Sequence, residues 1–202
     1  YTLDFHYDPK GRLQRAQGNW GKGLVIERND QGRIAALYQT NHEGQQRDVA
    51  SVRYTYDTAG DLIAHHNAAG HGEHYRYTNH VITQRTLATG ANFYFEWDQL
   101  NKKAKCLKQW SDHGNYAYTF AWDEKNQRSA ATNSLGHTTQ FTYNRFGLIT
   151  QEIDPEGHVH KKEYNDAGSV IAAIDPLGHK TEFLYDKEQH LLSVTNPLQQ
   201  RT

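Results

Sequence analysis

A motif that recurs about every 21 residues constrains the fold of this chain more than any other feature of its sequence. The clearest copy occupies residues 141–149 and reads FTYNRFGLI. Its pattern is an aromatic residue, any residue, a second aromatic residue, Asp or Asn, two further residues, Gly, one residue and an aliphatic residue. A fixed period of this kind indicates a repeat architecture, in which each unit packs mainly on its neighbours.

The second aromatic position of the motif, which we call the anchor, defines nine copies. The last three copies of the motif begin 21 residues apart, and the spacing between anchors elsewhere ranges from 20 to 28 residues. Two copies place Asn101 and Asn126 where the others have Gly, and a third places Gln189 there. Because Asn tolerates a positive φ better than most residues, we expect Asn101 and Asn126 to replace Gly in the turn. The anchors are Tyr7, Arg28, Tyr56, Tyr77, Trp97, Trp122, Tyr143, Tyr164 and Tyr185.

A second turn signal lies between successive anchors. Residues 154–157 read DPEG and residues 175–178 read DPLG. Asp first, Pro second and Gly fourth is typical of a type I turn. The stretches between turns have six to eight residues and alternate in polarity with a period of two, which favours strands over helices. Each repeat is therefore predicted to be a β-hairpin, and the chain to hold about 18 short antiparallel strands.

The fold class predicted is all-β, a hairpin array that forms a single-layer winding antiparallel sheet. We expect one continuous array over residues 1–202, with insertions near 38–50 and 102–115 that loop out. Only 36% of the residues are hydrophobic, and the mean hydropathy is −0.92. This is too little for a thick sandwich core. One row of aromatic and aliphatic side chains per hairpin is enough for one layer, with the anchor tyrosines stacking across strands and their hydroxyls in water.

Composition excludes several other classes of protein. No apolar run approaches the length of a membrane span. A net charge of −1 argues against a nucleic-acid binder. The single cysteine, Cys106, excludes an intramolecular disulfide framework and a zinc site with several thiolates. The chain starts at Tyr1 and contains no Met, so we expect it to be a segment of a longer polypeptide.

The sequence predicts no catalytic residue, no cofactor-binding residue and no metal ligand, and hence no enzyme and no cofactor. The densest histidine group is His65, His66, His71 and His74, and a surface metal site there is the alternative interpretation. However, His71, His137, His158 and His179 each follow a turn Gly, which indicates a repeat position instead. Cys106 is interpreted as incidental, and the lysine run at 102–105 as a solvated face.

Exposed aromatic residues offer a competing function. Aromatic rings on a repeat scaffold can stack on sugar rings, which would make the chain a carbohydrate or cell-surface recognition module. The candidates are Trp20, Trp97, Trp110 and Trp122. Trp97 and Trp122 occupy anchor positions, so we expect those two to pack between hairpins instead.

The repeat motif, its 21-residue period and its Asp-Pro-x-Gly turns resemble the Rhs/YD-repeat family over nearly the whole chain. Residues 95–112 also resemble the core of bacterial Rhs proteins, whose relatives include the cocoon-forming subunits of Tc toxins and the teneurins. The resemblance implies that the repeats form part of a hollow shell, or β-cocoon, that encapsulates a C-terminal toxin domain.

The resemblance also implies a biological setting. Bacterial Rhs proteins are secreted effectors of interbacterial competition, many of them delivered by type VI secretion. The implied partners are the remainder of the shell, its encapsulated toxin, and a secretion spike and chaperone that dock to an N-terminal region. The implied location is the bacterial cytoplasm before export, followed by delivery to a target cell. No partner nucleic acid or membrane span is implied.

Overall fold

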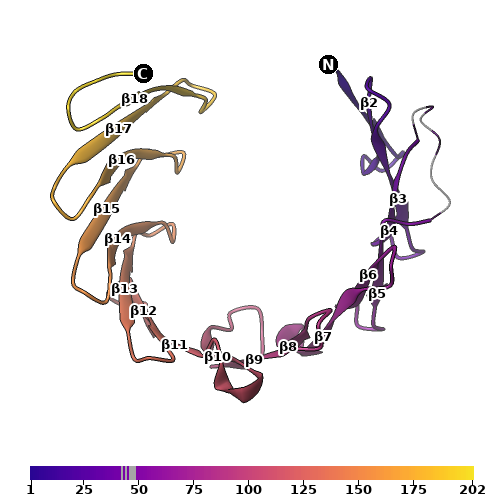
Figure 1. Cartoon of the computed structure of the whole chain (residues 1–202), viewed down its shortest axis with the longest axis horizontal. Helices are drawn as coiled ribbons and strands as arrows, with labels where there is room; N and C mark the ends of the chain where they lie inside the picture. Colours follow the sequence, from indigo (N-terminus) through magenta and orange to yellow (C-terminus); the bar gives the residue numbers. More distant parts are fainter. Residues whose placement is uncertain (42, 44, 46–48) are drawn as a thin grey trace. The chain divides into compact units, whose positions relative to one another are not determined.

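A computed structural model describes residues 1–41, 43, 45 and 49–202. The chain divides into two compact units, Tyr1–Ala104 and Lys105–Thr202. In Figure 1 the first unit runs from indigo to magenta and the second continues to yellow. Both units consist of β-hairpins, and the described residues contain no α-helix. None of them forms a helix long and apolar enough to cross a membrane.

The described part of the first unit contains nine strands, each paired antiparallel with the next along the chain. They are β1 (Leu3–Tyr7), β2 (Leu13–Gly18), β3 (Gly23–Arg28), β4 (Ile34–Gln39), β5 (Val52–Tyr56), β6 (Leu62–Asn67), β7 (Gly72–Thr78), β8 (Val81–Thr86) and β9 (Asn92–Trp97).

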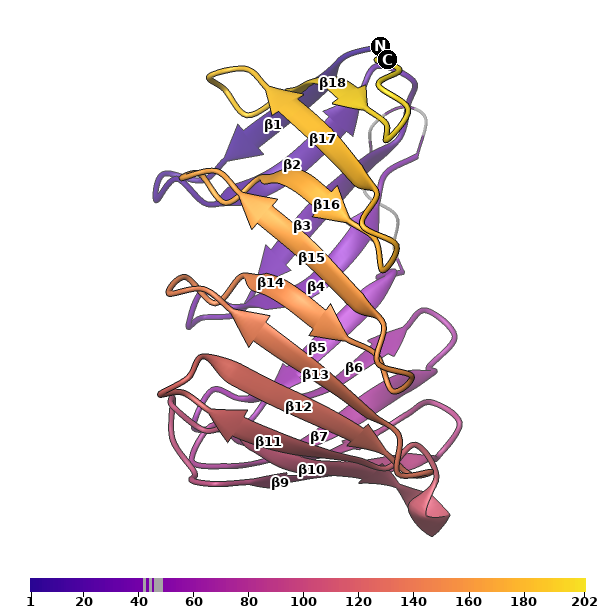
Figure 2. The same cartoon turned by 90° about the vertical axis from the view of Figure 1, so that its left-hand side faces the viewer.

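The second unit repeats this arrangement with nine further strands and one short 3-10 turn, η1 (Asp112–Gly114). The strands are β10 (Cys106–Ser111), β11 (Tyr118–Asp123), β12 (Arg128–Asn133), β13 (Thr138–Tyr143), β14 (Ile149–Ile153), β15 (Val159–Tyr164), β16 (Val170–Ile174), β17 (Lys180–Tyr185) and β18 (Leu191–Thr195). Figure 2 shows β13 to β18 running in alternate directions as one ladder. The predicted all-β hairpin array of 18 antiparallel strands is confirmed.

Every anchor lies at the end of an odd-numbered strand. Seven of the nine are the last residue of their strand, as Tyr143 is in β13, and the other two, Tyr77 in β7 and Trp122 in β11, are next to last. The motif therefore marks where each hairpin turns. The aromatic residues two positions apart lie on one strand face, as a period of two requires.

The turns have the geometry that the sequence predicts. In the turn after β14, the Gly157 N–H donates to the carbonyl of Asp154 at 3.0 Å, and the Asp154 N–H donates to the carbonyl of His158 at 3.0 Å. Gly157 has a φ of 89°. This is a three-residue hairpin loop, a type I turn closed by a residue in the left-handed region. Gln189 takes the same place after β17 with a φ of 67°.

Asn101 and Asn126, which were predicted to replace Gly, do not adopt the left-handed conformation. Neither Asn101 nor Asn126 has a positive φ, and in the β11–β12 turn the left-handed residue is Gln127 (φ 54°). Asn101 instead opens its turn, accepting the Ala104 N–H at its carbonyl and the Lys103 N–H at its side chain. The prediction for Asn101 and Asn126 was therefore wrong, because these loops differ in length from the common one.

A β-bulge next to the anchor is a feature that the motif alone does not predict. In the β13–β14 pair Thr142 lies opposite Gln151, but Tyr143 lies opposite Ile149, so Thr150 is the extra residue. The same shift occurs in seven hairpins of the described residues. A bulge increases local twist and bends the strand, so each hairpin turns at a fixed place.

The interior is thin, as the composition predicts. The buried apolar residues are Ala36, Tyr38, Ala50, Ala64, Val81 and Ala172. The accessible surface is 14011 Å², whereas a compact globular chain of this mass exposes about 9,700 Å². A single layer leaves both faces of each unit open, which accounts for the excess.

The two predicted insertions differ in structure. Residues 42, 44 and 46–48, which fall in the first, lie outside the described residues. Elsewhere in this insertion Thr40 and Ala50 are buried. The second insertion does not simply loop out, because residues 102–115 contain β10 and η1.

Candidate functional site

Five anchor side chains bind the hairpin before their own. Each donates a hydrogen bond to a backbone carbonyl in the first two residues of an earlier even-numbered strand. We call these bonds the anchor staples. They run from Arg28 Nη2 to Leu13 O (3.2 Å), Tyr56 Oη to Ile34 O (2.9 Å), Trp97 Nε1 to Ile82 O (2.6 Å), Trp122 Nε1 to Cys106 O (2.8 Å) and Tyr164 Oη to Ile149 O (2.6 Å).

The staples correct the expectation that anchor hydroxyls stay in water. The hydroxyls of Tyr56 and Tyr164 are bonded to backbone instead. Arg28, the one anchor without a ring, makes the same bond through its guanidinium. What the described anchors share is therefore a long side chain with a donor at its tip, which explains why Tyr, Trp and Arg all occur at this position.

The four tryptophans fall into two groups. Trp97 and Trp122 form staples, which supports their packing between hairpins, although the Trp122 residue remains 44% exposed. Trp20 is 43% exposed and meets the ring of Tyr1 edge-on at 5.9 Å between centroids. Trp110 is half-buried, with Lys108 Nζ 5.1 Å from its ring centroid.

Three histidines after turns pair with the carboxylate that opens the same turn. Nδ1 of His158 and of His179 lies 2.8 Å from Asp154 and Asp175, and Nδ1 of His190 lies 3.0 Å from Asp186. Partial burial opposes ionisation of Asp154, but hydrogen bonds from His158 outweigh it and hold its pKa below the usual value. These histidines close turns, in agreement with the interpretation as a repeat position.

The histidine group of residues 65–74 does not gather ligands for a metal. His66 and His74 rings meet edge-on at 5.3 Å, and His65 Nδ1 lies 3.1 Å from the Tyr75 hydroxyl. Among the described residues, the groups whose ligand atoms lie within 4.8 Å of one another are Asp154, Glu156 and His158, and Asp186, Glu188 and His190. In both, the histidine Nδ1 is already bonded to the turn aspartate.

The remaining sequence candidates have structural partners. The Cys106 thiol lies 3.3 Å from the carbonyl of Lys108. Of the lysine run, Lys102 and Lys103 are exposed, whereas Lys105 is half-buried and forms an ion pair with Glu124. No nucleophile–base arrangement follows from these contacts.

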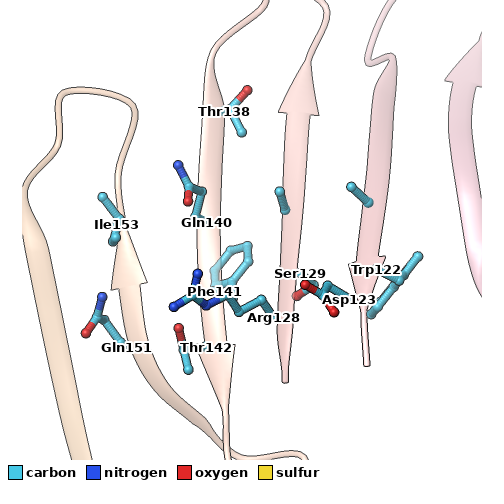
Figure 3. Close-up of a pocket in the computed structure, with 12 residues that line it drawn as sticks. Trp122, Asp123, Arg128, Ser129, Thr138, Gln140, Phe141, Thr142, Gln151 and Ile153 are labelled. Carbon is cyan, nitrogen blue, oxygen red and sulfur yellow. The ribbon is translucent and has the colours of Figure 1, made fainter. Parts of the chain in front are cut away.

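A groove of about 340 Å³ crosses β11, β12, β13 and β14 in the second unit (Figure 3). Sequence reasoning missed it, because the groove arises from register between strands. Strand pairing aligns its residues in two rows across the four strands. The first row is Ala121, Ala130, Gln140 and Ile153, and the second is Asp123, Arg128, Thr142 and Gln151.

The two rows share one face of the sheet. Each strand contributes residues two positions apart, and such residues point to the same side. Trp122, Ser129 and Phe141 also border the groove, but they form the intervening row. Their side chains therefore project to the opposite face. The groove face is thus made of small, amide, hydroxyl and charged side chains and contains no aromatic ring.

These observations define an all-β repeat protein in which an anchor residue lies at the turn of each hairpin and five anchors form staples to the preceding hairpin. The RHS repeat family model matches residues 122–159, which include the anchors Trp122 and Tyr143. Within the matched segment the chain carries an RHS repeat, as the motif predicts there. A comparison with curated proteins gives no match.

One solved structure resembles the chain in fold. A chain of the Tc holotoxin pore from Photorhabdus luminescens matches over 96% of this chain, with 12% identity and a TM-score of 0.51. The chain spans 11% of the length of that relative. The crystal structure of TcdB2-TccC3 with Cdc42 matches 95% of this chain and 16% of its own, with 11% identity and a TM-score of 0.31. At such identity, the holotoxin match shows the fold.

Proposed function

We propose that this chain is a wall segment of an Rhs shell that encapsulates a C-terminal toxin domain until delivery. The observation that carries the proposal is the regular array of stapled hairpins, each with its anchor at the turn. A wall needs cohesion between neighbours along one layer and no thick core, and this array has both properties.

The proposal gives the chain a structural role and no catalysis of its own. Its chemically reactive side chains serve turns and staples: the turn aspartates accept backbone N–H groups, and the histidines pair with them. Chemistry would then reside in the enclosed domain. The partners proposed are the remaining shell and the toxin, with a spike and chaperone for export by a type VI or related route. The setting proposed is interbacterial competition, with a cytoplasmic stage before delivery to the target cell.

The test uses the full-length polypeptide that contains this chain. Deleting residues 149–169 removes one 21-residue repeat and keeps the motif in phase, since Leu148 is then followed by Val170. We expect the intact protein to protect its C-terminal region from limited proteolysis and the deletion to expose it. The matched control is Phe146→Ala, which alters an exposed turn residue. Equally fast cleavage of that region in the intact and deleted proteins would contradict the proposal.

A recognition module is the second candidate, favoured by the exposure of Trp20 near a turn. It predicts glycan or receptor binding that Trp20→Ala or Trp110→Ala removes, measured on a glycan array. If the wild type binds no glycan, or if its binding survives both substitutions, the shell remains the better account.

A further inference from the structure

The first row of the groove supplies an apolar hollow. Ala121 and Ala130 lie directly opposite each other on β11 and β12. Two methyl groups side by side leave the surface lower there than at Gln140 and Ile153, which continue the row on β13 and β14. An apolar side chain from a ligand fits above the alanines and against Ile153, because burying such a group against methyl surface is favourable.

The second row supplies hydrogen bonds and no net charge. Asp123 and Arg128 lie opposite each other. The Asn126 side chain and N–H, with a smaller effect from Arg128, hold the pKa of Asp123 below its usual value. The carboxylate therefore stays ionised beside the guanidinium. A single cation next to an anion does not favour a phosphate or another strongly anionic ligand.

Two carboxamides in the groove are unused by the described chain. The side chains of Gln140 and Gln151 make no hydrogen bond with any residue in the described ranges. Each offers two donors and an acceptor. They lie on adjacent strands and on different rows, so they flank the path of a ligand that crosses the sheet. The backbone of a polypeptide can pair with such groups, because a carboxamide and a peptide unit each have an N–H donor and a C=O acceptor.

The dimensions of the groove match a short extended chain. Four strands at about 4.8 Å spacing span about 14 Å from the first to the last. An extended polypeptide advances about 3.3 Å per residue, so about five residues cover this distance. An oligosaccharide fits less well, because sugar binding by stacking needs an aromatic ring. The rings that border the groove, Trp122 and Phe141, project to the opposite face.

We propose that the groove across β11–β14 docks an extended, uncharged segment of unfolded polypeptide. The proposal rests on the proposed function, since the contents of a shell of this kind are a polypeptide, and it identifies the Ala121–Gln140 face of the second unit as the one that meets them. Backbone amides bind Gln140 and Gln151, while an apolar side chain fills the space above Ala121 and Ala130.

The test measures binding of fluorescently labelled α-lactalbumin to the 202-residue protein by anisotropy. The α-lactalbumin is reduced and carboxamidomethylated, which keeps the chain permanently unfolded and adds no charge at its cysteines. Ala130→Phe fills the hollow. Its control is Ala131→Phe, the next residue on β12, which pairs with Phe120 and Thr139 on the opposite face. Phe is favourable in strands, so both variants are compatible with the fold. We expect Ala130→Phe to weaken binding at least tenfold and Ala131→Phe to leave it within twofold of wild type.

A second variant removes hydrogen bonds without adding bulk. Gln140→Ala with Gln151→Ala is expected to weaken binding about fivefold, as the loss of modest hydrogen bonds does. Binding weakened only by Ala131→Phe would overturn the groove proposal but leave the shell, because the other face would then hold the cargo. Absence of binding would also overturn the groove proposal. The shell proposal would still be tested separately, by the proteolysis experiment on the full-length protein. Binding of maltoheptaose that depends on Gln140 would overturn it in favour of a glycan site.

Discussion

At the scale of single residues, the anchor staple offers a test that removes one hydroxyl. Tyr164→Phe deletes the donor to the Ile149 carbonyl and leaves the ring. We expect a loss of about 1 kcal/mol in the free energy of unfolding, the usual worth of such a bond. The control is Tyr185→Phe, an equally half-buried anchor of the same unit whose hydroxyl has no bond within the described residues. Urea unfolding measures both, and equal losses would show that the staple adds nothing.

A second residue-scale prediction concerns pH. The bond to Asp61, followed by its charge, raises the pKa of His80 above 6.5. A raised pKa in the folded state means that the pair stabilises fully below the unfolded value and that this contribution is lost as pH rises through the folded value. Asp61→Asn is expected to return the His80 pKa toward 6.5, as NMR titration would show. Asp30→Asn, a change at an exposed turn carboxylate, is the control, and an unchanged His80 titration in Asp61→Asn would contradict the assignment.

At the scale of the element, the turns predict stability changes of opposite sign. Gly178 has a φ of 85° and open space around the position of a Cβ. Gly178→Ala should therefore cost about 1 kcal/mol through backbone strain alone. Gln127 adopts the left-handed conformation although it carries a side chain. Gln127→Gly should therefore stabilise the protein by about 0.5 kcal/mol. Thermal unfolding measures both changes in stability. Changes of the same sign would contradict the inference that the left-handed position of these turns favours Gly.

How far the elements could be predicted depends on whether their cause is local. The motif at Tyr143 and the turn at Asp154 predict a strand end and a hairpin because one stretch of chain contains all the atoms involved. The β-bulge at Thr150 and the left-handed place of Gln127 depend on the length of each loop, and so they were missed or misplaced. The groove was missed because its cause is not local either: Ala121 and Gln140 are brought near each other only by the register of three strands.

At the scale of the whole molecule, an array stabilised by neighbours should respond locally to damage. Tyr38 is 5% exposed and packs in a cluster with Ala36 and Ala50. Its hydroxyl donates to Glu27 at 2.7 Å, and Arg53 donates to that hydroxyl at 3.2 Å. Tyr38→Ala leaves a cavity and removes the hydrogen bonds of the hydroxyl with Glu27 and Arg53. We therefore expect the free energy of unfolding to fall by about 3 kcal/mol.

Because each hairpin contacts only its neighbours, this loss should stay near β4. Amide hydrogen exchange is expected to accelerate in β3, β4 and β5 of Tyr38→Ala, while β7 and β8 of the same unit keep wild-type rates. The control is Tyr7→Ala, the same chemical change at a residue that is 60% exposed, which should leave β3 to β8 unaltered. Equal acceleration across β3 to β8 would mean that the unit unfolds as one cooperative body, and the nearest-neighbour account of the wall would then fail.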